Sequence, residues 1–226
     1  MLKAVIFDVD GTLVDSVDLH AQAWVDAFKE IGHDIDFASV RGQIGKGGDQ
    51  LMPVFLSKEE LEQKGASLSK RRGDILKQRY LSKIKPFPDV RALFERIKAD
   101  GTRIVLASSA KADELETYKK IANIDGLTDA QTSSDDAEES KPEPDIFEAA
   151  MSKLGDVRPD EIIVVGDTPY DAEAAAKAGL HTIGVLCGGF SEDSLREARC
   201  IAIYKGPTDL LAQYDRSPLA PNSAQS

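Results

Sequence analysis

The chain is predicted to fold as an α/β protein: a doubly wound, Rossmann-like parallel sheet core with an inserted helical cap domain. Short apolar runs alternate with amphipathic helical patterns, which favours right-handed crossovers and a parallel sheet covered on both faces. The alternation breaks between residues 16 and 85, where helical patterns follow one another without a strand. A length of 226 residues suits one large core with a smaller insert.

Four apolar runs rich in β-branched residues are predicted as strands covered on both faces. They are residues 3–9, 103–107, 161–165 and 181–186. Helical patterns are predicted between and after the later runs, at residues 90–99, 112–121, 145–154 and 170–178. The first run stops at Asp10-Gly11, a dipeptide that is common in turns.

The insert is predicted to be helical, with patterns at residues 20–30, 50–55 and 59–80. The pair Asp15-Ser16 suits its start, because it can cap the first helix, and Pro86 and Pro88 mark the return. We therefore expect a core of residues 1–15 and 86–215, a cap of residues 16–85 and a loose tail of residues 216–226. Two crossings between core and cap would let the cap move as a lid.

The composition mainly excludes classes of partner. A net charge of −11 would repel nucleic acid and anionic membranes over most of the surface. No segment is long and apolar enough for a membrane span, and the first residues lack a signal-peptide core. Only Cys187 and Cys200 are present, so no disulfide framework is expected. These observations predict a cytoplasmic protein, as a monomer or small homo-oligomer.

The first predicted strand ends in an acidic run, Asp8-Val9-Asp10-Gly11-Thr12. The carboxyl ends of parallel strands are where ligands bind, and two neighbouring carboxylates there call for a cation. A simple Asp-Gly turn is the alternative, and for this dipeptide alone it would be the better interpretation.

Other predicted strand ends carry complementary groups. Ser108 and Ser109 follow the run at 103–107, and Asp167 follows the run at 161–165, with Asp171 one helical turn later. Lys141 stands between them, held at a helix entry by the proline that follows it. A nucleophile, a hydroxyl donor, a cation and metal-binding acids are thus predicted to meet at one edge of one sheet.

The chain resembles the haloacid dehalogenase superfamily, because four motifs occur in that family's order. They are DVDGT, the serine after the second strand, the SKP lysine and GDTPYD. The resemblance covers nearly the whole chain and indicates the branch with a helical cap, which includes proteins similar to phosphoglycolate phosphatase and β-phosphoglucomutase. It implies that Asp8 is the nucleophile and Asp10 the general acid and base. Ser108, Ser109 and backbone N–H groups would bind the phosphoryl oxygens, and Lys141 would pair with phosphate and Asp8.

The same resemblance implies a Mg²⁺ ion held by Asp8, the backbone carbonyl of Asp10 and Asp167. Asp171 would orient these ligands without binding the ion itself, or would reach it through a water molecule. Some relatives have two adjacent acids where this chain has Gly166-Asp167. That departure makes Asp167 the main metal candidate and gives Asp171 more importance.

Cap residues are predicted to choose the substrate. By resemblance, the glycine-rich stretch from Arg41 to Gly48 descends over the site, where Arg41 or Lys46 could bind the leaving group. A solvated turn is the alternative for both. His20, with Trp24 one turn on, could steer Asp10 or be merely structural. Lys111 and Glu114 could line the entrance to the site, but an interpretation as ordinary solvated helix residues is preferred.

The expected activity is hydrolysis of the phosphomonoester of a small phosphorylated metabolite through an aspartyl-phosphate on Asp8. Asp10 favours phosphoryl transfer, since halide-displacing relatives lack an acid at this position. Two alternatives stay open. A sugar phosphomutase of the same branch would use the same two acids, and a phosphate-binding module would have lost turnover.

Overall fold

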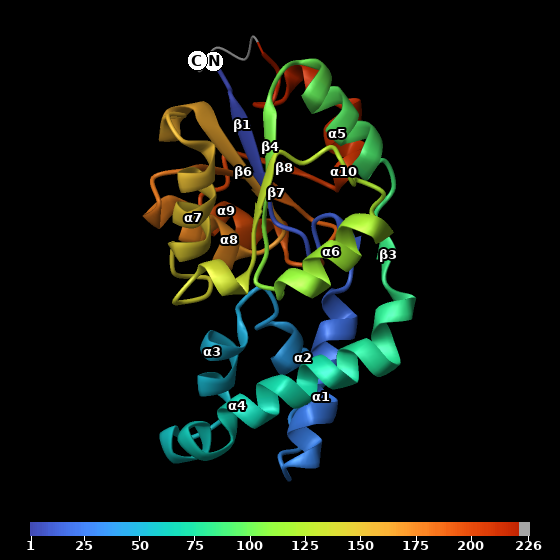
Figure 1. Cartoon of the computed structure of the whole chain (residues 1–226), viewed down its shortest axis with the longest axis vertical. Helices are drawn as coiled ribbons and strands as arrows, with labels where there is room; N and C mark the ends of the chain where they lie inside the picture. Colours follow the sequence, from blue (N-terminus) through green and yellow to red (C-terminus); the bar gives the residue numbers. More distant parts are fainter. Residues whose placement is uncertain (222–226) are drawn as a thin grey trace.

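The computed structural model describes residues 1–221, and a six-stranded parallel sheet forms its centre (Figure 1). The strand order is β5-β4-β1-β6-β7-β8. The strands are β1 (Ala4–Phe7), β4 (Arg103–Ala107), β5 (Ala130–Thr132), β6 (Ile162–Gly166), β7 (His181–Val185) and β8 (Ala202–Tyr204). This arrangement confirms the predicted α/β class and the four predicted strands. The two strands of this sheet that were not predicted, β5 and β8, are three-residue edge strands, too short to show a pattern.

Alternation along β1 explains why helices cover both faces of the sheet. Val5 and Phe7 point into one apolar cluster, and Ala4 and Ile6 point into another. The first cluster is completed by α5 (Val90–Ala99), α6 (Ala112–Ile121) and α10 (Pro207–Ala212). The second is completed by α7 (Asp145–Leu154) and α8 (Pro169–Lys177). A further helix, α9 (Glu192–Glu197), contacts α8. Short 3₁₀ segments are η4 (Ser134–Asp136), η5 (Pro159–Glu161) and η6 (Tyr214–Arg216).

The segment between β2 and β3 is helical and lies at the end of the sheet where β1 and β4 terminate (Figure 1). It consists of α1 (Val17–Glu30), α2 (Phe37–Arg41), α3 (Gly48–Leu51), η1 (Met52–Val54), α4 (Lys58–Ile75), the π-helical η2 (Leu76–Tyr80) and η3 (Leu81–Lys83). We call residues 17–83 the cap and the rest the core. The cap has an apolar cluster of its own, in which Trp24 stacks on Phe28. A capping box between Ser57 and Glu60 starts α4.

The chain passes between core and cap along two adjacent strands. β2 (Val14–Asp15) and β3 (Lys85–Pro86) pair antiparallel, so both crossings lie side by side. Ser16 follows β2, and its predicted role as a capping side chain is wrong. Its φ of −128° and ψ of −15° depart from the extended backbone that a capping residue adopts, and its hydroxyl donates to Asp10 instead.

The C-terminal segment differs from the expected loose tail over the part that the structure describes. Ser217 and Leu219 are buried, and the Ser217 hydroxyl donates to the carbonyl of Tyr214 at 2.7 Å. Packing against the core therefore orders this stretch despite its Pro- and Ser-rich composition. Residues 222–226 of the predicted tail lie outside the described residues. Within residues 1–221, no helix has the length and apolar character needed to cross a bilayer.

Candidate active site

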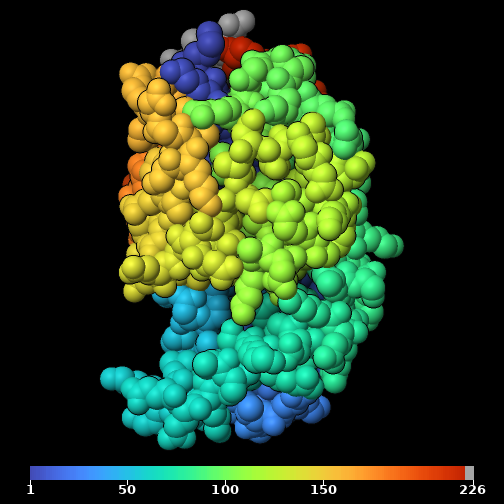
Figure 2. Space-filling model, in the orientation of Figure 1, coloured from blue at the N-terminus to red at the C-terminus, as the bar shows by residue number. Residues whose placement is uncertain are grey.

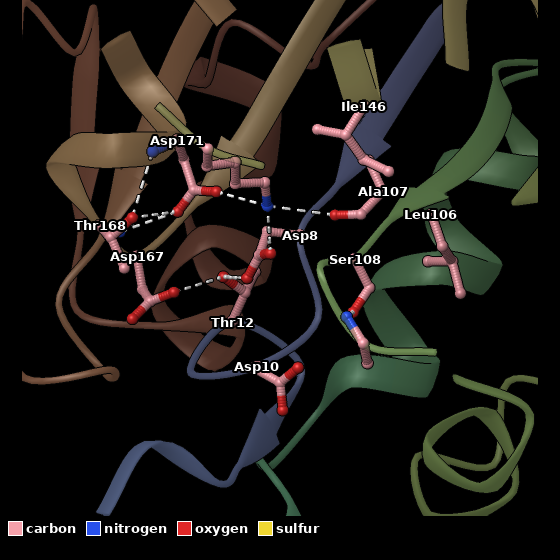
Figure 3. A network of polar contacts seen from close by, with 12 residues as sticks. Asp8, Asp10, Thr12, Leu106, Ala107, Ser108, Ile146, Asp167, Thr168 and Asp171 are labelled. Atoms are coloured by element: carbon pink, nitrogen blue, oxygen red, sulfur yellow. Dashed lines mark hydrogen bonds and ion pairs between the residues drawn. The ribbon is translucent and has the colours of Figure 1, made fainter. Parts of the chain in front are cut away.

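Side chains from several strand ends meet at the carboxyl edge of the sheet (Figure 3). Asp8 follows β1, Ser108 follows β4 and Asp167 follows β6, and the order β4-β1-β6 makes these strands neighbours. The Asp8 N–H donates to the carbonyl of Val165 at 2.9 Å, which continues the ladder one residue beyond β1. Pairing of the parallel strands thus fixes the position from which the Asp8 carboxylate projects.

Lys141 is buried beside this edge and joins two carboxylates. Its Nζ lies 2.6 Å from Asp8 Oδ1 and 2.7 Å from Asp171 Oδ1, and it donates to the carbonyl of Ala107 at 3.2 Å. Burial alone would lower the pKa of the Lys141 ammonium, but the charges of Asp171 and Asp8 raise it above its ordinary value. Lys141 is therefore a fixed positive charge at the site.

Three buried carboxylates lie around one point. Oxygen atoms of Asp8, Asp167 and Asp171 lie within 4.8 Å of one another, a spacing that could hold a metal ion. Thr12 Oγ1 lies 3.1 Å from Asp8 Oδ2 and 3.1 Å from Asp167 Oδ1, and bridges these two acids. Asp171 is held from the other side by Thr168, whose hydroxyl donates to Oδ2 at 2.7 Å.

The electrostatics of this cluster fit a divalent cation. Burial raises the pKa of Asp8 to about 7, with Lys141 opposing the rise and Asp171 adding to it. Burial, followed by repulsion from Asp8, raises the pKa of Asp167 well above its usual range. If all three acids ionise, the single ammonium of Lys141 leaves two negative charges. In addition, Asp167 Oδ2 is buried without a hydrogen-bond partner, as a metal ligand would be before binding its ion.

Two glycines allow backbone to approach Asp167 closely. A Cβ atom added to Gly11 would lie 2.3 Å from Asp167 Oδ2, and one added to Gly188 would lie 1.7 Å from it. Gly11 also has a φ of +83°, which favours glycine independently. The loop after β7 therefore closes over the carboxylate, and any side chain at Gly188 would displace Asp167.

Asp10 lies apart from the three-carboxylate cluster (Figure 3). Its Oδ1 accepts a hydrogen bond from the Ser16 hydroxyl at 2.6 Å and lies 2.9 Å from His20 Nε2. Burial would raise the pKa of Asp10, but the charge and hydrogen bond of His20, with the Ser16 hydroxyl, hold it below its ordinary value. Tyr118 supports this arrangement, since its hydroxyl lies 3.1 Å from the same His20 nitrogen.

A small cavity of about 50 Å³ opens above Asp8 and Asp10, between core and cap. Of the predicted substrate-binding residues, His20, Lys46 and Ser109 line it. Lys46 is also held locally, because its Nζ donates to Gln43 Oε1 at 2.7 Å and lies 4.7 Å from the centre of the Tyr170 ring.

Two predicted phosphate- or substrate-binding residues do not line this cavity. Arg41 is not among the residues that line this cavity; its Nε pairs with Asp18 at 2.6 Å and its Nη2 donates to the carbonyl of Gly188 at 2.9 Å. It thus links the cap to the core loop beside Asp167. Ser108 is fully buried, and its Oγ accepts from the N–H of Ala110 at 3.0 Å, which shapes the turn after β4.

Some residues of the site were missed from the sequence. Thr12 stands inside the DVDGT motif and could have been found from its place beside two acids. Arg72, on α4, and Glu114, on α6, both line the cavity, and Glu114 is 5% exposed. The preferred interpretation of Glu114 as a solvated helix residue is therefore wrong, and its place in the cavity lining agrees with the alternative, a residue at the entrance. No local signal marks Arg72, because its helix is distant in the sequence from the motif acids.

Comparison with known proteins agrees with this geometry. A family model described as "Haloacid dehalogenase-like hydrolase" matches residues 5–185. The phosphorylated carbohydrates phosphatase of Thermotoga maritima is 27% identical, over 93% of this chain and 97% of its own. The phosphoglycolate phosphatase of Aquifex aeolicus is 28% identical, over 83% of this chain and 86% of its own.

A solved structure is similar over the whole fold. The crystal structure of a hydrolase from Pseudomonas syringae superposes with a TM-score of 0.87 at 28% identity, and covers 95% of this chain and 98% of that one. The resemblance seen in the sequence motifs is confirmed by both kinds of comparison. The chain belongs to the haloacid dehalogenase-like hydrolase family.

Proposed function

We propose that this protein is a Mg²⁺-dependent phosphatase that hydrolyses the phosphomonoester of a small metabolite through an aspartyl-phosphate on Asp8. The observation that carries the proposal is the position of Asp8, at the floor of the cavity with Lys141 2.6 Å from its Oδ1. An ammonium at this distance favours the ionised, nucleophilic carboxylate and can also meet a phosphoryl oxygen. The relatives from Thermotoga maritima and Aquifex aeolicus are both named as phosphatases, which supports the same activity.

Asp8, Asp167 and the backbone carbonyl of Asp10 would hold the Mg²⁺ ion, with Asp171 acting directly or through a water molecule. When bound, the ion would neutralise the charge that keeps a phosphate dianion away from the Asp8 carboxylate. The unpartnered Asp167 Oδ2 and the two excess negative charges support this assignment.

Asp8 and Asp10 would divide the chemistry. In the first step, an Asp8 oxygen bonds to phosphorus as the bond to the leaving oxygen breaks, and Asp10 supplies the proton that this oxygen needs. In the second step, the Asp10 carboxylate takes a proton from water, which attacks the phosphorus, releases inorganic phosphate and restores Asp8. The low pKa of Asp10 suits the second role, and the nearby charge of a phosphate dianion would raise that pKa for the first.

The other predicted residues would serve binding and positioning. Lys141 and Ser109, with Ser108 shaping the turn, would meet the phosphoryl group, whereas Lys46 faces the leaving group from the cap. His20 would orient Asp10. Arg41 would hold the closed position of the cap rather than touch the substrate, because its guanidinium reaches the Gly188 carbonyl.

Release of inorganic phosphate from a panel of phosphorylated metabolites, including p-nitrophenyl phosphate, tests the proposal with and without Mg²⁺. Mg²⁺-dependent turnover by the wild-type protein and none by Asp8→Asn is the expected result. Turnover that requires a bisphosphate primer would instead identify a phosphomutase. Absence of turnover with retained phosphate binding would identify a binding module.

A further inference from the structure

Glu114 is a buried acid that the proposed chemistry does not use. It lies in the first turn of α6 and is 5% exposed, yet its carboxylate has no hydrogen bond or ion pair to any of residues 1–221. A carboxylate in this turn stabilises the helix dipole, but the neighbouring Asp113 already does so from the surface, where it pairs with Lys77 at 2.7 Å. A buried charge without a partner is costly, so its retention points to a ligand.

Arg72, on the cap helix α4, faces the same space. Its Nε atom is buried without a hydrogen-bond partner, while its guanidinium carbon lies 5.2 Å from the Trp24 ring centre and its Nη1 lies 3.4 Å from His20 Nδ1. In the part of the chain that the structure describes, Arg72 pairs with no carboxylate, Glu114 included. The site therefore presents a guanidinium and a carboxylate that form no ion pair within residues 1–221.

Both side chains stand at the junction of two cavities. They line the inner cavity of about 50 Å³ that contains Asp8, and also an outer one of about 490 Å³ between α4 and the core loops. Figure 2 shows the face where the teal α4 region meets the green and yellow core residues. Two lysines of the outer cavity are already paired, Lys70 with Asp74 and Lys77 with Asp113. A leaving group that extends outward from a phosphate on Asp8 would pass between Glu114 and Arg72.

We propose that Glu114 and Arg72 form a leaving-group subsite that selects hydroxyl-bearing phosphomonoesters, those of sugars and polyols, over esters whose leaving group carries a carboxylate. The inference rests on the proposed phosphatase function and names its substrate class. An ionised carboxylate only accepts hydrogen bonds, and a guanidinium only donates them. A hydroxyl group does both, so vicinal hydroxyls satisfy the two residues at once. A carboxylate would satisfy Arg72 but be repelled by Glu114, and an ammonium group would do the reverse.

The test compares kcat/KM for sorbitol 6-phosphate and glucose 6-phosphate with kcat/KM for phosphoglycolate. Wild-type protein is expected to prefer the hydroxyl-bearing esters. Glu114→Ala should lower their kcat/KM at least about tenfold, since a hydrogen bond to a charged group is lost, while phosphoglycolate is unchanged or improved. Glu114→Gln keeps the shape and one acceptor, so it should shift the ratio in the same direction by less. Arg72→Ala should lower kcat/KM for both kinds of substrate.

Glu116→Gln is the matched control, because Glu116 lies on the same helix but binds Gln131 and Lys119 away from both cavities. It should leave the substrate ratio unchanged. A wild-type preference for phosphoglycolate, or a ratio that Glu114→Ala and Glu114→Gln do not alter, overturns the subsite.

Failure of the phosphatase proposal is recognised separately. The leaving group of p-nitrophenyl phosphate has neither hydroxyl nor carboxylate, so its hydrolysis reports on the chemistry at Asp8 alone. If it is not turned over, thermal-shift titrations of wild type and Glu114→Gln with sorbitol 6-phosphate and phosphoglycolate still decide the subsite. Tighter binding of sorbitol 6-phosphate than of phosphoglycolate, by a margin that Glu114→Gln reduces, supports it, and equal binding overturns it.

Discussion

His20 Nε2 lies 2.9 Å from Asp10 Oδ1, so a side chain of the first cap helix touches the second acid of the core motif. Replacing His20 by Ala should lower kcat for p-nitrophenyl phosphate about tenfold with little change in KM, because Asp10 loses the partner that orients it for proton transfer. His33 offers a matched control, since it pairs with Glu60 inside the cap, 2.8 Å away. If His20→Ala has the same kcat as His33→Ala, His20 has only a structural role.

Asp8→Asn should reduce turnover at least about 10³-fold while leaving the fold intact. The amide is a poor nucleophile, and Lys141 keeps Asp171 as a charged partner 2.7 Å away. Rapid-quench labelling with a ³²P-labelled substrate should trap an acid-stable phosphoprotein in the wild type and none in the variant. Circular dichroism verifies folding, and retention of wild-type turnover by Asp8→Asn would refute covalent catalysis at this residue.

Asp167→Asn should make the metal-free protein more stable, by about 1–3 kcal/mol at pH 7. The reason is that burial and the Asp8 charge raise the pKa of Asp167, so its ionised form costs folding free energy. Mg²⁺ should raise the melting temperature of the wild type and have a much smaller effect on the variant. Asp156→Asn, at an exposed acid, is the control. Equal Mg²⁺-induced shifts in wild type and Asp167→Asn would exclude Asp167 as a ligand.

Lys46→Ala should change substrate preference more than it changes turnover of a small generic ester. Lys46 lines the cavity from the cap, whereas Asp8 and Lys141 belong to the core. The measurement is kcat/KM over the metabolite panel relative to p-nitrophenyl phosphate. Loss by the same factor for every substrate would argue that Lys46 only holds the loop, through Gln43 and Tyr170.

Asp26→Asn should destabilise the cap by about 1–2 kcal/mol at pH 7. Burial would raise the pKa of Asp26, but hydrogen bonds from Tyr80, Gln22 and Arg79 lower it below the ordinary value of 3.8. The stabilisation is therefore complete above pH 3.8 and is lost as the pH falls through the lower, folded-state pKa. Urea unfolding between pH 7 and pH 2.5 should show the penalty shrinking only at the acid end.

The control for Asp26→Asn is Asp34→Asn, because Asp34 is an exposed acid of the same cap. Tyr80→Phe should reproduce part of the loss, since it removes the 2.8 Å hydrogen bond to Asp26. A penalty that is equal at pH 7 and pH 2.5 would show that the charge of Asp26 contributes nothing.

Much of the fold follows from local pattern. The apolar runs of β1, β4, β6 and β7 are long enough to be predicted as strands. Their order implies that Asp8, Ser108 and Asp167 lie at one edge of the sheet. The edge strands β5 and β8 were not predicted, because three half-buried residues carry no distinctive periodicity.

Two predictions made from local sequence were wrong. Serine is a common helix cap, but the Ser16 hydroxyl donates to Asp10 at 2.6 Å and makes no capping hydrogen bond to the helix. Residues 217–220 have the composition of a loose tail, yet Leu219 finds an apolar cluster to fill. In both cases a contact in the folded chain outweighed the local preference.

The sequence by itself determined the α/β class, the motif acids and Lys141, because strand periodicity and motif order are local properties. Only the tertiary structure decided which groups line the cavities between core and cap. Burial of Glu114 opposite Arg72, and the use of Arg41 as a bridge to Gly188, depend on how the cap packs on the core. That packing is set by contacts between residues far apart in the chain, which leave no pattern along it.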